Sequence, residues 1–161
     1  MSTLPNKLNQ MKRQFYFLLA CISTVYIFLT ACQKEEDVAP PTKAEIIARS
    51  PWVFQGVTAG GSDVSNNAAL VCIKDNTITF TTSGGYTVTE GTTVCSPSTA
   101  GTFTWSFQTN ETQLVLSAAL FPGGSGTFDI ITLNDINLVV SQNVAIPPSL
   151  SPVQVVFTFK H

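Results

Sequence analysis

Apolar and polar residues alternate one by one along most of the chain from Trp52 onward, and this period of two constrains the fold more than any other feature. A β-strand places successive side chains on opposite faces of a sheet, so each alternating segment predicts a strand with one buried face. Eight such segments are present. Their apolar positions are Trp52/Phe54, Ile78/Phe80, Tyr86/Val88, Phe103/Trp105/Phe107, Leu114/Leu116, Phe128/Ile130, Leu138/Val140 and Val153/Val155/Phe157/Phe159.

Short turn sequences such as Ser83-Gly84-Gly85 and Pro122-Gly123-Gly124 separate these segments. Connections this short join antiparallel neighbours and leave no room for crossover helices. A meander with one apolar face covers that face by curling into a barrel or by folding into a sandwich. We favour the barrel because ten aromatic rings share the predicted inner face. The prediction is an all-β fold: an up-and-down antiparallel β-barrel of about eight strands.

A short helix is expected before the first strand. Thr42-Lys43-Ala44-Glu45 has the arrangement of a capping box, in which a hydroxyl and a carboxylate each accept from a free main-chain amide. Ile46 and Ile47 supply its apolar side, and Ser50-Pro51 ends it.

The first 31 residues have the layout of a secretory signal peptide. Lys7, Lys12 and Arg13 precede an apolar run, residues 15–29, which is shorter than the ~20 residues of a spanning helix. Met1 and Met11 both remain candidate starts.

Leu29-Thr30-Ala31-Cys32 resembles the bacterial lipobox, in which the chain is cut before the cysteine and the cysteine is lipidated, for example with palmitate. We therefore expect Cys32 to be the lipidation site and the mature protein to be anchored in a membrane by its lipid. A plain signal peptide with an unrelated cysteine and an uncleaved anchor are the alternatives.

Residues 32–42 are interpreted as the lipidated cysteine and a flexible acidic, proline-containing linker, and residues 43–161 as the barrel domain. Gln33-Lys34-Glu35-Glu36-Asp37 resembles the export signal that sends lipoproteins of Bacteroidota to the cell surface. A simple solvated tether explains the same residues, and both interpretations can hold. The expected location is the outer membrane, at the cell surface or otherwise on the periplasmic face.

Cys72 and Cys95 would be the only thiols left in the exported domain. Export to an oxidising compartment favours a disulfide between them. A metal pair or a catalytic thiol is the alternative, but no histidine lies near either cysteine in the sequence, and two sulfurs do not complete a zinc site.

Charge and residue types argue against several functions. The chain has 8 basic and 10 acidic residues, and all the acidic ones follow residue 34. The part of the chain after the predicted signal peptide is therefore acidic, and we do not expect it to bind nucleic acid. The single histidine, His161, is the last residue, and no nucleophile and base can be paired, so we expect no catalytic residues and no cofactor. Two groups of oxygen ligands, Asp63/Asn66/Asn67 and Asn134/Asp135/Asn137, lack the spacing of a calcium loop and are better explained as turns, so no metal site is predicted.

Several of these features occur together in one known family. They are the lipobox, a Trp opening the first strand, Cys72 and Cys95 on either side of Asp75–Phe80 and Gly85-Tyr86, and the later pair Phe128–Leu133 and Leu138–Val140. Through these features the chain resembles the lipocalin-like lipoproteins of Bacteroidota over residues 43–161. The resemblance implies a small up-and-down barrel on a lipid tether, in a family whose members mostly lack an assigned activity.

Two functions are compatible with such a barrel. In the first, a small hydrophobic ligand enters the barrel and contacts Trp52, Phe54, Tyr86, Phe103 and Trp105. In the second, these rings fill the barrel, and a non-enzymatic structural or interaction subunit displays its loops to a cell-surface protein. The loops expected to serve that role are Ala59–Leu70, Gly91–Ala100 and Ser141–Ser151.

Overall fold

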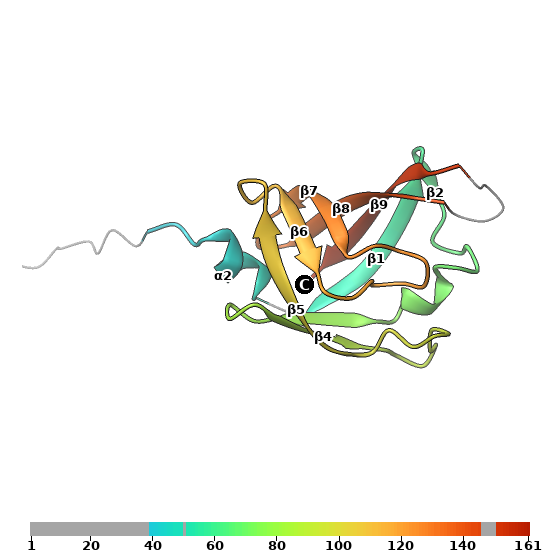
Figure 1. Ribbon diagram of the computed structural model, residues 1–161, viewed down its shortest axis with the longest axis horizontal. Coiled ribbons are helices and arrows are strands. Elements are labelled where there is room, and N and C mark those ends of the chain that lie inside the picture. Colours follow the sequence, from blue (N-terminus) through green and yellow to red (C-terminus); the bar gives the residue numbers. More distant parts are fainter. Residues whose placement is uncertain (1–38, 50, 146–150) are drawn as a thin grey trace, which may run out of the picture. The chain divides into compact units, whose positions relative to one another are not determined.

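The computed structural model describes residues 39–49, 51–145 and 151–161 (Figure 1). All of these except Ala39 belong to one compact unit, Pro40–His161. The predicted signal peptide (1–31), the predicted lipidation site Cys32 and most of the linker lie outside the described residues. In the part of the chain that the structure describes, no helix is long and apolar enough to cross a membrane.

Eight antiparallel strands form a closed barrel, and a short ninth strand makes a hairpin with the first. Each barrel strand pairs with the next along the chain, and β1 also pairs with β9, which closes the sheet. The strands are β1 (Trp52–Ala59), β2 (Ser62–Asp63), β3 (Thr77–Phe80), β4 (Gly85–Thr89), β5 (Gly101–Gln108), β6 (Gln113–Leu116), β7 (Thr127–Leu133), β8 (Asn137–Val144) and β9 (Val153–Lys160). The predicted all-β, up-and-down barrel of eight strands is confirmed.

The inside of the barrel holds the predicted aromatic rings. Eight of the ten are buried, and the remaining two, Phe103 and Phe107, are partly buried against the same core. Directly paired residues lie on the same face of a sheet, so pairs such as Phe80 with Tyr86 and Val140 with Phe157 carry the inner face from strand to strand. The alternation read from the sequence therefore marks the interior.

One end of the barrel is closed by the short helix α2 (Lys43–Ile47). Thr42 and Glu45 form the predicted capping box. The indole Nε1 of Trp52 donates to the carbonyl oxygen of Ile47 at 2.7 Å, and the Trp52 ring packs on that of His161 with centroids 3.9 Å apart. Trp52 thus joins the helix, the first strand and the end of the chain. The long connections β1–β3, β4–β5 and β6–β7 lie at the opposite end of the barrel (Figure 1).

Two predicted loops are partly wrong. Ala59–Leu70 contains the last residue of β1 and the short strand β2, which pairs with β1. Ser141–Ser151 was expected to be an exposed loop, but β8 continues through Val144 and buries Ser141 and Gln142. Ser141, Gln142 and Asn143 are polar, so the hydrophobicity pattern does not show that the strand continues. The burial of every second side chain nevertheless continues through Gln142 and Val144. Residues 146–150 lie outside the described part of the chain.

Replacing Trp52 by alanine should destabilise the domain by about 3–5 kcal/mol, because it removes a fully buried ring and the contact between α2 and the barrel. Thermal or urea unfolding measures the change. The matched control is Val94→Ala, whose side chain is 62% exposed and whose replacement should change stability by no more than about 0.5 kcal/mol. Equal stability of the two variants would contradict a sealing role for Trp52.

Candidate functional site

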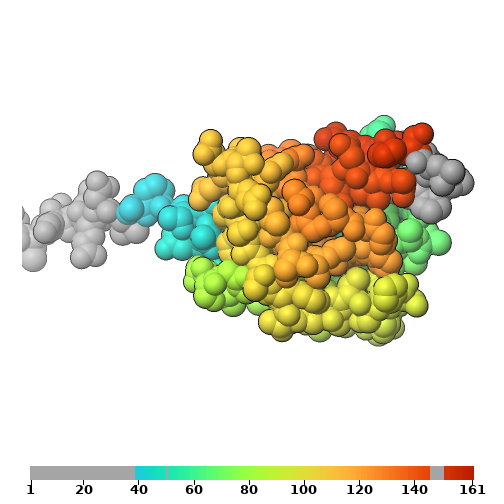
Figure 2. All heavy atoms as spheres, in the orientation of Figure 1, coloured from blue at the N-terminus to red at the C-terminus, as the bar shows by residue number. Residues whose placement is uncertain are grey.

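The segment between β6 and β7, residues 117–126, which we call the flap, lies beside the part of β8 that is no longer paired with β7. The register pairs β7 with β8 only from Leu138 to Ser141, so the last residues of β8 pair with β9 alone. The flap leaves the wall where Ser117 N–H donates to the Thr104 carbonyl, and it returns where Leu116 N–H donates to the Gly126 carbonyl. Figure 2 shows the gold and orange part of the chain forming a continuous surface over this face.

The flap sends apolar side chains into the barrel. Leu120 and Phe121 are 6% and 2% exposed. The ring of Phe121 stacks on that of Phe157 with centroids 5.1 Å apart, and Phe128 packs edge-on against Phe157 at 5.9 Å. A Cβ atom on Gly124 would lie 2.7 Å from the Phe121 ring, so this position needs glycine for the ring to fit.

Tyr86, on β4, holds the near end of the flap. Its hydroxyl donates to the carbonyl oxygen of Ala118 at 2.9 Å and accepts from the Ala118 main-chain amide at 3.3 Å. Burial raises the pKa of the Tyr86 phenol, so the hydroxyl stays protonated and able to donate over the whole physiological range.

Gln142, on β8, holds the far end. Its Oε1 accepts from the main-chain amide of Ser125 at 3.0 Å and from the Ser125 hydroxyl at 3.1 Å. The side chain is on the inner face and Gln142 is 6% exposed, yet its Nε2 makes no hydrogen bond within the described part of the chain. Asn76, 4% exposed, is a second buried amide whose side-chain atoms make none there.

The five residues predicted to contact a ligand all belong to the core, but they do not gather at one place. Phe80, Tyr86 and Phe103 form one run of contacting rings, which Trp105 extends from Phe80. Phe54 packs edge-on against Phe159, and Trp52 packs against His161. No finding tests whether any of them binds a ligand, so that role stays a prediction.

Sequence patterns did not identify the flap residues Leu120 and Phe121, or Gln142, whose side chain holds the flap. Pro122-Gly123-Gly124 was interpreted only as a turn, and an apolar pair beside a turn gives no alternation to read. A signal for Gln142 did exist, because it continues the inner parity of Leu138 and Val140.

Three of the six oxygen ligands considered for calcium, Asp63, Asn67 and Asn134, shape turns. Asn67 and Asn134 accept from main-chain amides close by, and Asp63 accepts from the Ser65 amide. Bonds from Ser65 also lower the pKa of Asp63. Among the described residues, no three of His, Cys, Asp and Glu gather where a metal ion could bind.

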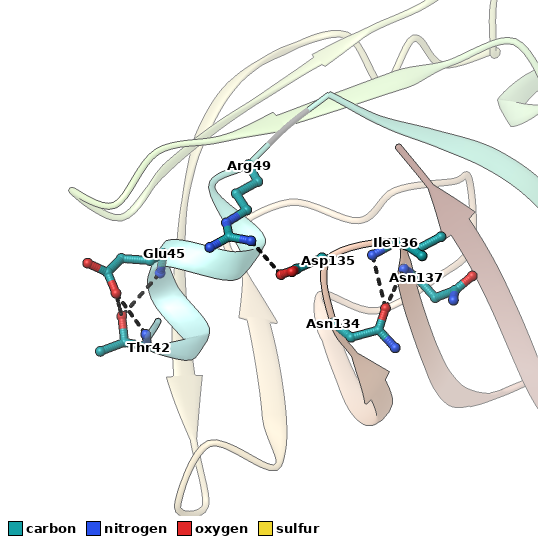
Figure 3. Close-up of polar contacts among 7 residues, drawn as sticks. All are labelled: Thr42, Glu45, Arg49, Asn134, Asp135, Ile136 and Asn137. Carbon is teal, nitrogen blue, oxygen red and sulfur yellow. Dashed lines mark hydrogen bonds and ion pairs between the residues drawn. The ribbon is translucent and has the colours of Figure 1, made fainter. Parts of the chain in front are cut away.

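A shallow depression of about 370 Å³ lies between α2 and the β7–β8 turn, lined by Ile46, Leu133, Asn134, Asp135, Ile136 and Asn137. Two of its polar side chains already have partners (Figure 3). Asn134 Oδ1 accepts from the main-chain amides of Ile136 and Asn137, and Asp135 pairs with Arg49. Asn134 Oδ1 and the Arg49–Asp135 pair are therefore already engaged and are not available to orient a ligand in this depression.

The β4–β5 loop, residues 90–100, is held firmly to the barrel. Cys72 and Cys95 form the predicted disulfide. The Glu90 carboxylate accepts from the main-chain amides of Thr99 and Cys95 at 2.7 and 3.3 Å and from two hydroxyls, and Asp75 accepts from the Thr93 amide at 3.0 Å. These bonds, the one from the Thr99 amide foremost, lower the pKa of Glu90.

Replacing Glu90 by glutamine should lower the melting temperature at pH 7 because the amide accepts fewer of these bonds. A carboxylate whose pKa is depressed in the folded state stabilises that state above its ordinary pKa, about 4.3. This stabilisation is lost as the pH falls through the folded pKa. The difference in melting temperature between wild type and Glu90→Gln should therefore shrink below about pH 4.

Circular dichroism between pH 7 and pH 2 measures this difference. Glu111→Gln, which removes an exposed carboxylate that makes no side-chain hydrogen bond to the described residues, controls for the loss of charge. A difference for Glu90→Gln that stays constant with pH would argue against the carboxylate clamp.

Comparison with known proteins agrees with the barrel. A protein-family model described as "Lipocalin-like domain" matches residues 51–140, more than half of the chain, from the start of β1 into β8. Among curated proteins, none matches the chain. The family match and the closed antiparallel barrel agree, and the chain belongs to the lipocalin-like domain family.

Proposed function

We propose that this protein is a lipid-anchored lipoprotein whose lipocalin-like barrel binds a small hydrophobic ligand. The observation that carries the proposal is the construction of the wall. A segment rich in glycine, rather than a strand, covers one part of the barrel, and it places Leu120 and Phe121 inside. A wall segment that can move without breaking strand pairing gives a ligand a way to the apolar interior.

The interior suits an apolar, ring-bearing molecule. The ring of Phe157 contacts those of both Phe121 and Phe128 beneath the flap, and Tyr86 joins the rings on the neighbouring strands to the flap. Aromatic faces and edges favour aromatic partners. Lipocalin-like folds typically bind ligands rather than catalyse reactions, and the proposal is for binding without catalysis.

A hydrocarbon probe tests ligand binding directly. We expect 2-isopropenylnaphthalene to quench tryptophan emission in a saturable way and to raise the melting temperature of wild type, because a ligand that binds only the folded state stabilises it. At one hundred times its dissociation constant the stabilisation is about 2.7 kcal/mol. An unchanged melting temperature at saturating probe would contradict the proposal.

A second candidate is an interaction subunit with a filled barrel. The observation that favours it is the β4–β5 loop, which the Cys72–Cys95 bond and Glu90 hold in place while Val94 stays 62% exposed. Loops on a rigid scaffold commonly serve recognition. Failure of the hydrocarbon probe to bind would favour this candidate.

Anchoring rests on the motif Leu29-Thr30-Ala31-Cys32. We propose that the mature chain begins at Cys32, that it is lipidated there, and that it resides in the outer membrane of a bacterium of the Bacteroidota type. The acidic residues after Cys32 support display at the cell surface, and the periplasmic face is the alternative.

Replacing Cys32 by serine should abolish incorporation of labelled palmitate and release the protein from the membrane fraction, because no thiol remains to accept the acyl group. Cys21→Ser, within the predicted signal peptide, is the matched control and should leave labelling intact. Protease treatment of intact cells separates surface display from the periplasmic face. Labelling that survives in Cys32→Ser would contradict the assignment.

A further inference from the structure

We propose that the flap covers a binding site for neutral, ring-bearing molecules that carry one hydrogen-bond acceptor, such as a carbonyl oxygen. The ligand ring takes the place of Phe121 against Phe157, and the acceptor receives an N–H of Gln142. The inference rests on the proposed ligand-binding function and adds the chemical class of the ligand.

The position of Gln142 is fixed by strand pairing. It lies directly opposite Val155, which is fully buried, so both side chains are on the inner face. Phe157 is two residues further along β9, which makes it the diagonal neighbour of Gln142 on that face. Diagonal neighbours are within reach of long and aromatic side chains. The Gln142 amide and the Phe157 ring that stacks on Phe121 therefore belong to one compartment.

The orientation of the Gln142 amide follows from its partner. The main-chain N–H of Ser125 can only donate, so the side-chain atom that faces it must be the carbonyl oxygen. The NH₂ group is consequently the end without a partner among the described residues, in a side chain more than nine-tenths buried. A buried unpaired donor costs free energy that a ligand acceptor would recover.

The ring of Phe121 shows what fits beneath the flap. It stacks on Phe157 with an interplanar angle of 29° and is held by a segment that contains Pro122, Gly123 and Gly124. The side-chain bonds that fasten the flap, from Tyr86 and to Gln142, join neutral groups and involve no ion pair. A ligand ring that displaced Phe121 would regain the same stacking.

The charges of the barrel favour a neutral ligand. Lys43, Arg49, Lys74 and Lys160 are the cationic side chains of the described residues, and none of them is buried. Lys43 donates to the Glu111 carbonyl, Lys74 donates to Asn66 and Arg49 pairs with Asp135, all in exposed positions. A buried carboxylate would have no cation from these residues to pair with and would be strongly disfavoured.

A matched pair of probes separates the two parts of the proposal. 2-Acetylnaphthalene carries a carbonyl oxygen where the nearly isosteric 2-isopropenylnaphthalene carries a CH₂ group. Calorimetric titration of the folded chain measures both affinities. Gln142→Met, which keeps the side-chain length and removes the amide, should weaken binding of the ketone about fivefold and change binding of the hydrocarbon less than about twofold. Asn143→Met, an exposed amide on the same strand, should change neither.

The place of the ring is tested with Phe121→Ala, which should bind both probes at least about tenfold more tightly because the site no longer has to be emptied. Phe121→Leu keeps the core largely filled, so it still reports if the alanine variant fails to fold, and it should bind both probes more tightly than wild type. Probe binding no tighter in either variant would overturn the placement of the ligand ring.

The remaining outcomes are distinct. If Gln142→Met weakens both probes equally, the amide only seals the flap and the acceptor part of the proposal is wrong. If Gln142→Met leaves ketone binding unchanged while both probes bind wild type, the inference about Gln142 fails and the proposed function stands. If neither probe binds any variant, the proposed function itself fails.

Discussion

The pairing of β1 with β9 is the constraint on which the rest of the structure depends. Without it, the sheet would have two free edges and an apolar face open to water. With it, every inward position of eight strands contributes to one enclosed core, and Trp52 at the start of β1 comes to rest beside the end of the chain at His161. Closure therefore explains both the burial of the rings and the sealing of one end by α2.

Two connections of this barrel are fastened by different chemistry. The β4–β5 loop is held by a disulfide and by the carboxylates of Glu90 and Asp75, which bind main-chain amides. The flap is held by Tyr86 and Gln142, which are neutral, and by the packing of Phe121. Charged groups make the stronger hydrogen bonds, so the flap is the more easily displaced of the two. This difference places the proposed entrance at the flap and leaves the β4–β5 loop as a fixed feature of the surface.

The two proposed functions differ in what fills the interior. Rings that contact each other from Phe107 to Phe103 across three strands stabilise the fold whether or not a ligand binds. The compartment beneath the flap is different, because its filling side chain comes from a glycine-rich segment and its wall carries an amide whose NH₂ group has no partner among the described residues. We therefore place the proposed ligand site on the flap side of the barrel, and whether the rings predicted to form the wall also contact a ligand stays a prediction.

Local patterns in the sequence determined much of this protein. Alternation from Trp52 onward predicted the strands and their inner face, short turns predicted the meander, Thr42 and Glu45 predicted the helix cap, and two remaining cysteines predicted the disulfide. Each of these depends on residues close in sequence or on simple counting. Only the tertiary structure decided that Phe121 packs on Phe157 and that Gln142 fastens Ser125. These contacts join segments far apart in the chain, and they depend on where β6 and β7 stop and on how a loop without periodicity crosses the gap between them.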